Sequence, residues 1–174
     1  MEYSDENSYF AVLEALTDVI LNRGGMEWLN IMSKADVNPD EGNYLKLKDE
    51  LEIRKFNFIE LYNLNYQDLD FIDNLEHNIR VFSVDGAKEP DWDFIINAAI
   101  ALGEYIIIRV GGEWLFSEQD ERLYLSHIGG LENEQMNCLL LVSRYWSKPE
   151  YNPYSIKKVF LRIQGNLSEN LSIN

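Results

Sequence analysis

Carboxylates supply most of the reactive side chains in this chain, and they are dense in one segment that carries no positive charge. From Phe56 to Ile79 there is no lysine or arginine, and five acids stand beside two tyrosines: Glu60, Asp68, Asp70, Asp73 and Glu76, with Tyr62 and Tyr66. Unpaired carboxylates attract a basic protein surface, and tyrosine is a frequent anchor of protein interfaces. These seven residues are therefore the candidate site, and we expect them to bind a basic protein partner.

Nucleophilic and metal chemistry is not indicated by the remaining residues. The single cysteine, Cys138, lies in an apolar run, which favours a small buried core residue. The two histidines, His77 and His127, also have apolar neighbours, and no Gly-x-Ser-x-Gly surrounds Ser126 beside His127. The segment 68–73 lacks the glycine and the terminal glutamate of a calcium loop. We expect no catalytic residue, no metal site and no cofactor.

An enzyme of an unrecognised type remains an alternative. It would use carboxylates such as Asp91, Asp93 and Glu113, two of which suit a magnesium ion. The start of a helix explains Asp91 and Asp93 equally well, because the positive end of the helix dipole favours acids there. The glycine pairs are not part of any phosphate-binding loop, and they are interpreted as turns.

Net charge restricts the class of partner. The 174 residues include 30 acids and 15 bases, a net charge of −15, and 21 of the acids precede residue 94. Such a field repels nucleic acid and anionic membrane, so neither is expected as a partner. One mildly basic segment, from Arg144 to Arg162, is interpreted as charged sheet surface or a local protein contact. Hydrophobic content of 46% and aromatic content of 13% indicate a folded chain.

The first residues, Met-Glu-Tyr-Ser-Asp-Glu, lack the apolar core of a secretory signal, and no apolar stretch approaches the roughly 18 residues of a membrane span. We therefore expect a cytoplasmic protein. The oligomeric state is left open.

Hydrophobic periodicity predicts helices in the first two thirds of the chain. Apolar residues recur at helical spacing over Tyr3–Asn22, a shorter helix fits Met26–Ala35, and Asn38–Gly42 is a turn cluster. A further helix is predicted over Tyr66–Asn78, followed by a short strand at Arg80–Val84. The next helix begins near Pro90 and reaches at least Leu102.

Two segments admit both helix and strand. Over 44–62, alternation of leucine with charged residues favours a strand in the first half, whereas Leu47, Leu51, Phe58 and Leu61 also fit one helical face. Over 103–116, either Gly103 ends the preceding helix and 105–110 forms a hairpin with 113–116, or the helix continues to Gly111. A glycine inside a helix costs only about 1 kcal/mol relative to alanine, so we prefer the long helix.

The last third is predicted to be strand-rich. Arg122–Ile128, Asn137–Trp146 and Ile156–Ile163 are rich in aliphatic and aromatic residues and are separated by Gly-Gly and proline-containing segments. The predicted fold class is α+β, with N-terminal and central helices packed on a mostly C-terminal antiparallel sheet. We expect a single domain over 1–164, and a flexible polar tail over 165–174.

A small, acidic, cytoplasmic α+β chain without catalytic motifs resembles the bacterial immunity proteins that neutralise toxin domains delivered by neighbouring cells. The resemblance is one of general character along the whole chain and brings no motif. It implies an inhibitor that blocks the basic active-site cleft of a toxin such as a nuclease with an acidic surface. The alternatives are a structural or adaptor module in a protein assembly, the enzyme described above, and a nucleic-acid mimic that binds a DNA-binding protein.

Overall fold

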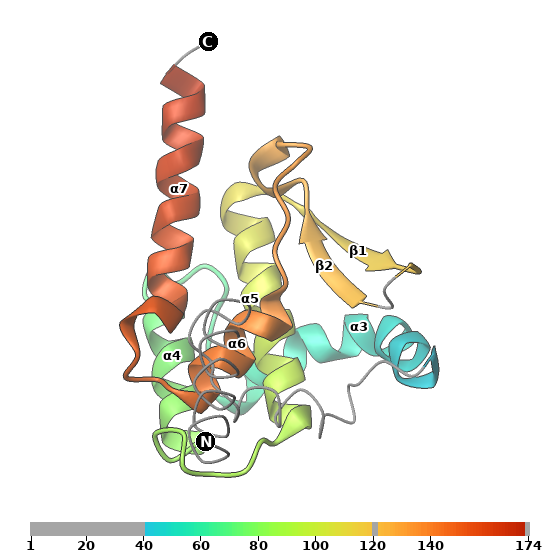
Figure 1. The fold of residues 1–174 in the computed structure, drawn as a ribbon, viewed down its shortest axis with the longest axis vertical. Helices are drawn as coiled ribbons and strands as arrows, with labels where there is room; N and C mark the ends of the chain where they lie inside the picture. Colours follow the sequence, from blue (N-terminus) through green and yellow to red (C-terminus); the bar gives the residue numbers. More distant parts are fainter. Residues whose placement is uncertain (1–40, 120–121, 173–174) are drawn as a thin grey trace, which may run out of the picture.

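The computed structural model describes residues 41–119 and 122–172 of the chain (Figure 1). The predicted helices Tyr3–Asn22 and Met26–Ala35 lie outside these residues, as does most of the predicted turn Asn38–Gly42. The described elements are helices α3 to α7, strands β1 and β2, and two short 3-10 helices, η1 and η2.

Helix α3 spans Glu41–Leu61, so the strand preferred for its first half is wrong. Long-range packing decides between the two periodicities, because Leu51 and Phe58 are buried, at 8% and 1% exposed, on the face toward the core. Arg54 fixes the helix laterally: it pairs with Glu50 one turn earlier, and its guanidinium also donates to Asp93 and Asn97 of α5, at 2.9 Å each. In a strand, Arg54 could not reach Glu50 in the same way, because the helical spacing of four residues is what places the two side chains on one face.

Helix α4 spans Phe71–Phe82 and begins later than predicted. Its buried face consists of Phe71, Ile72, Leu75 and Ile79, which confirms the helical spacing. The predicted strand at Arg80–Val84 is wrong, because the helix continues through Phe82 and is followed by turns. Val84 and Asp85 have φ values of 52° and 51° in these turns, a left-handed conformation incompatible with a strand.

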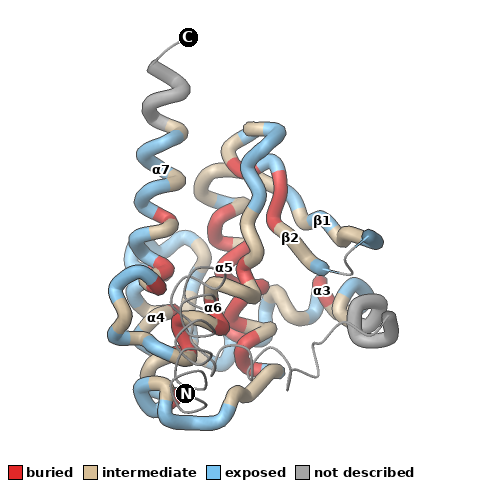
Figure 2. The backbone as a smooth tube through the Cα atoms, viewed as in Figure 1, coloured by how far each residue is buried: buried red, intermediate tan, exposed pale blue. Residues whose placement is uncertain are grey.

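Helix α5, Trp92–Val110, confirms the long-helix alternative. Asp91 is its N-cap and accepts a 3.0 Å hydrogen bond from the Phe94 amide. The helix ends at Gly111, where φ is 86° and glycine avoids steric strain. Nearly all of its middle residues are buried, so α5 is the central element on which the others pack (Figure 2).

The sheet is one antiparallel hairpin. Strand β1, Glu113–Ser117, pairs with β2, Arg122–Ser126, in a register that places Leu115 opposite Tyr124. The predicted strand at 122–128 is confirmed for most of its length. The alternative hairpin between 105–110 and 113–116 is wrong, since 105–110 belongs to α5. Helix η1 follows at Ile128–Gly130.

Apart from β2, the last third is helical, so the two remaining predicted strands are wrong. Helix α6 spans Cys138–Ser147, η2 spans Asn152–Tyr154 and α7 spans Ile156–Ser172. The Asn137 side chain caps α6 by accepting a 3.0 Å hydrogen bond from the Leu140 amide. Buried residues of α6 recur at helical spacing: Cys138, Val142, Tyr145 and Trp146. Helix α7 continues through Gly165 to Ser172, where a flexible tail was predicted.

The fold is thus α+β in the coarse sense, with a small sheet in the middle of the chain instead of a C-terminal one. Its core centres on aromatic rings from four segments: the Phe94 ring stacks on Phe82 at 4.2 Å between centroids and lies 5.5 Å from both Phe58 and Trp146. None of the described helices is both long and apolar enough to cross a membrane.

Candidate functional site

The outer face of α3 carries large apolar side chains in contact with solvent. Two consecutive residues per turn are exposed, at 48–49, 52–53, 56–57 and 60–61, which forms a continuous stripe because residues four apart share a helix face. Within it, Ile53 is 67% exposed, Phe56 52% and Leu61 71%. Exposed apolar clusters of this kind mark interaction sites more often than ordinary surface.

Carboxylates flank these apolar residues. Asp49, Glu52 and Glu60 belong to the same exposed stripe. Glu52 forms a 2.7 Å salt bridge with Lys55, whereas neither Asp49 nor Glu60 forms a salt bridge with another described residue. The stripe therefore combines apolar contact area with two carboxylates, Asp49 and Glu60, that form no salt bridge within the described fold, and with one exposed base, Lys48.

The loop at 62–70, between α3 and α4, continues the stripe and is held by its own hydrogen bonds. The Leu64 amide donates to the Ile59 carbonyl at 2.8 Å, and the Asn65 side chain accepts from the Gln67 amide at 2.9 Å. The Arg109 guanidinium of α5 donates to the Gln67 carbonyl. The loop is consequently fixed to the central helix and needs little ordering to meet a partner.

Asp68, Leu69 and Asp70 lie at the exposed end of this loop. Leu69 is 87% exposed, and both aspartates are exposed. Asp70 occupies the N-cap position of α4, yet its side chain makes no capping hydrogen bond. Neither aspartate forms a salt bridge with a residue in the described ranges. We define the α3–loop surface as the exposed apolar residues of the stripe and of this loop, together with their exposed acids that form no salt bridge within the described ranges: Asp49, Ile53, Phe56, Glu60, Leu61, Asp68, Leu69 and Asp70.

The two predicted tyrosine anchors lie inward of this surface. The Tyr62 ring centroid is 4.7 Å from that of Phe58, and Tyr66 is 5.4 Å from Phe71. The Tyr66 hydroxyl donates to the Lys55 carbonyl. Burial raises the pKa of both phenols, with Asp91 adding to the effect at Tyr62 and Glu104 at Tyr66. Both tyrosines therefore pack the loop onto the core.

Asp73 and Glu76 face the start of α7. Asp73 accepts two hydrogen bonds from the Lys157 ammonium, at 2.5 and 2.8 Å, and these bonds raise the pKa of Lys157. One oxygen of Glu76 accepts from the Lys157 amide at 3.0 Å and from the Ser155 hydroxyl at 3.1 Å. Both acids thus stabilise the first turn of α7. The predicted set is divided: Glu60, Asp68 and Asp70 face solvent, and the other four residues hold the structure together.

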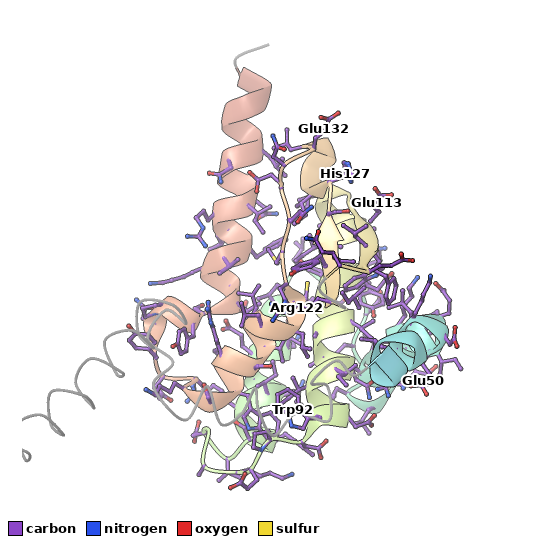
Figure 3. The ribbon with its side chains drawn as sticks, turned by 45° about the vertical axis from the view of Figure 1, so that its right-hand side comes forward. Glu50, Trp92, Glu113, Arg122, His127 and Glu132 are labelled. Carbon is purple, nitrogen blue, oxygen red and sulfur yellow. The ribbon has the colours of Figure 1, made fainter. Side chains whose placement is uncertain are left out.

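One group of side chains resembles a catalytic arrangement, and its geometry differs from a triad. Ser126 Oγ lies 3.3 Å from His127 Nδ1, and Glu113 Oε1 lies 2.8 Å from the same nitrogen. In a Ser-His-Asp triad the hydroxyl and the carboxylate bind opposite ring nitrogens: one nitrogen takes the hydroxyl proton, while the carboxylate accepts the N–H of the other and holds the ring in place. Here both compete for Nδ1. Figure 3 shows Glu113 and His127 near each other at the hairpin, directed outward.

The acids of the enzyme alternative do not converge. Asp91 caps α5, Asp93 pairs with Arg54 at 2.9 Å, and Glu113 follows the other end of the same helix. The 19 residues of α5 therefore separate Glu113 from Asp91 and Asp93 by roughly 28 Å. Within the described residues no three His, Cys, Asp or Glu side chains are grouped so as to hold a metal ion.

Cys138 is buried in α6, as the sequence predicts, at 2% exposed. Burial raises the pKa of its thiol to about 12, so the thiolate that a nucleophile requires is disfavoured.

The residues that sequence reasoning missed are chiefly apolar: Ile53, Phe56, Leu61 and Leu69, with Asp49 beside them. The signal for the first two was available: if Leu51 and Phe58 face the core of a helix, positions 53 and 56 fall outside that face. No protein-family model, curated protein or solved structure matches this chain.

Proposed function

We propose that this protein is an inhibitor that binds a basic protein partner through the α3–loop surface, as an immunity protein that blocks the active-site cleft of a toxin such as a nuclease. The observation that supports this most is the combination of exposed Leu61 and Leu69 with Glu60, Asp68 and Asp70, three acids without a salt bridge among the described residues, at the end of α3 and on the hydrogen-bonded loop after it. Leucines supply contact area that slows dissociation, and the surrounding charge speeds encounter with a positive cleft.

Inhibition by this surface is steric and electrostatic. The carboxylates occupy the positions that substrate phosphates take in a nuclease cleft, and the apolar residues exclude water around them. Because Tyr66 and Arg109 fix the loop, little conformational entropy is lost on binding. The inhibitor contributes no reacting group of its own, so its effect depends on affinity alone.

A growth-protection assay tests the proposal. A bacterial host produces each of a panel of nuclease toxin domains with basic active-site clefts, together with either the wild-type chain or Asp68→Lys/Asp70→Lys. We expect the wild type to restore growth and the double variant to fail, since two reversed charges that meet a basic cleft weaken binding by roughly 10-fold to 100-fold.

The matched control is Glu132→Lys/Glu134→Lys. It changes net charge by the same amount, with the same two-residue spacing, and both glutamates are exposed. Figure 3 shows Glu132 far above Glu50, which belongs to α3. This control should still protect. Equal protection by both variants would contradict the assignment of the surface, and loss of protection only in Leu69→Ala would show that the inhibitor binds through apolar contact and not through these charges.

A further inference from the structure

A groove of about 1080 Å³ lies between the segment before α6, helix α6 itself, η2 and α7. Its apolar lining comes from two helices that converge: Leu140 and Leu141 of α6, and Val159 and Ile163 of α7. Helix α7 is anchored in its first two turns, where Ile156 and Phe160 are buried, and it extends beyond the other elements in Figure 1. The groove therefore flanks a helix that is only partly covered by the described fold.

Basic side chains rim this groove, in a chain whose net charge is −15. Arg144, Lys158 and Arg162 line it, and Glu134 is the one acid among the described residues of the lining. Neither Lys158 nor Arg162 forms a salt bridge with a described carboxylate, whereas the neighbouring Lys157 pairs with Asp73. Burial lowers the pKa of Arg144. The lining thus suits an occupant that is both apolar and acidic.

We propose that the occupant is a segment of this same chain, residues 3–22. Residues 1–22 contain five carboxylates and no lysine or arginine. The segment also carries apolar residues at intervals of three and four: Phe10, Leu13, Leu16, Val19 and Ile20. An apolar stripe beside acids matches an apolar groove with a basic rim, in the manner of helix-in-groove recognition.

The connection is long enough. Residues 23–40 separate the segment from the start of α3 at Glu41, and 18 extended residues reach about 60 Å. A domain of this size has a radius of gyration of roughly 14 Å, so every part of its surface lies within reach. Tethering also gives the segment an effective concentration of about a millimolar, and a weak contact is then sufficient for occupancy.

This inference is independent of the proposed function, because the groove and the α3–loop surface contain no common residue. The inference assigns different roles to two groups of acids in the chain. Those of residues 3–22 face the basic groove, and those of the α3–loop surface remain available to an external partner.

Hydrogen exchange on the full chain tests the inference. We expect amides of residues 3–22 to exchange at least about 10-fold more slowly than an unstructured peptide, and Lys158→Glu/Arg162→Glu to remove most of that protection. The control Arg122→Glu/Lys148→Glu reverses two cations outside the groove lining and should leave protection unchanged. Adding Glu14→Lys/Asp18→Lys to the groove variant should restore the protection of residues 3–22, because the charges of the groove and of the segment are then opposite again. Protection of α5 amides reports that each variant is folded.

A second measurement uses the unmodified protein, so that a folding defect in a variant does not decide the outcome. A carbodiimide, which joins an amine to a carboxylate in direct contact, should link Lys158 to an acid within residues 2–18 at any protein concentration. Unprotected exchange of residues 3–22 in the wild type, or equal protection in the groove and control variants, would overturn the inference. A cross-link that appears only at high protein concentration would overturn it too, by assigning the groove to a second copy.

Discussion

Gly103→Ala should destabilise this protein, although alanine is the better helix former. Gly103 is buried in the middle of α5, and the Trp114 ring from β1 lies directly against it. A Cβ atom at position 103 would lie 2.1 Å from Trp114 Cη2 and 2.3 Å from Cζ2, far inside van der Waals contact. The ring must move, and the 2.6 Å hydrogen bond from Trp114 Nε1 to Glu104 moves with it.

Three terms set the magnitude. Replacing glycine by alanine inside a helix gains about 1 kcal/mol. Overpacking a close contact costs about 1–3 kcal/mol, and weakening the hydrogen bond costs about 1 kcal/mol more. We therefore expect a net loss of roughly 2 kcal/mol in the free energy of unfolding. At a urea dependence of about 2 kcal/mol per molar, the midpoint falls by about 1 M.

Two further variants isolate the cause. In a Trp114→Ala background the obstacle is absent, so Gly103→Ala should stabilise by about 1 kcal/mol relative to Trp114→Ala alone. Gly165 is the matched control, because it lies in α7 and a methyl group added there would meet no atom within 4 Å. Gly165→Ala should raise the unfolding free energy by about 1 kcal/mol, since alanine is the better helix former at an open position.

Urea unfolding followed by circular dichroism at 222 nm measures each of these proteins without depending on tryptophan fluorescence. The reasoning is refuted if Gly103→Ala is as stable as the wild type, or if its effect has the same sign with and without Trp114. A destabilising Gly165→Ala would contradict the helical assignment of the last segment.

Two other predictions concern single side chains. Cys138 should resist thiol reagents at pH 8 in the native protein and react at the rate of unfolding, because burial raises its pKa to about 12; fast native labelling would show an exposed thiolate. The unfolded thiol loses its proton first, so this group's contribution to stability is complete below about pH 9 and declines toward pH 12. Glu76→Ala should lower the unfolding free energy by about 1–2 kcal/mol, and Glu76→Gln by less, since the amide retains an acceptor for the Lys157 and Ser155 donors. Equal losses in the two Glu76 variants, measured by urea unfolding, would exclude that acceptor role.

Helix α5 was predictable because its signals are local. Asp91 caps it, and Gly111 ends it at a positive φ that glycine tolerates. Helix α6 was mistaken for a strand because Leu139–Val142 is an apolar run too short for periodicity to separate helix from strand. The cap at Asn137, which satisfies the Leu140 amide, was the signal that favoured a helix. For α3 and α7, the choice between helix and strand is decided by packing: α3 packs on α5, and α7 packs on α4. These contacts join segments far apart in the sequence, so a short stretch of sequence does not reveal them.

The sequence predicted where the acids of the candidate site are concentrated. It did not predict which of them face solvent and which form salt bridges within the fold. Counting acids identifies Glu60, Asp68 and Asp70 as a cluster, and the structure leaves them exposed. Asp73 belongs to the same cluster in sequence, yet it pairs with Lys157, 84 residues away. This salt bridge forms because the start of α7 packs beside α4, a tertiary contact that the local sequence does not indicate. The inward position of Tyr66 likewise depends on the Lys55 carbonyl, which it reaches only because α3 is a helix.

The salt dependence of partner binding tests the proposed function most directly. The dissociation constant of the full chain for a nuclease toxin domain against which it protects a host is measured at low and high ionic strength, for the wild type and for Asp68→Lys/Asp70→Lys. We predict tight wild-type binding that weakens at least about 10-fold as salt screens the surface, and a variant that binds weakly with a much smaller salt effect. Absence of binding by the wild type, or the same affinity and salt dependence in both proteins, would contradict the account.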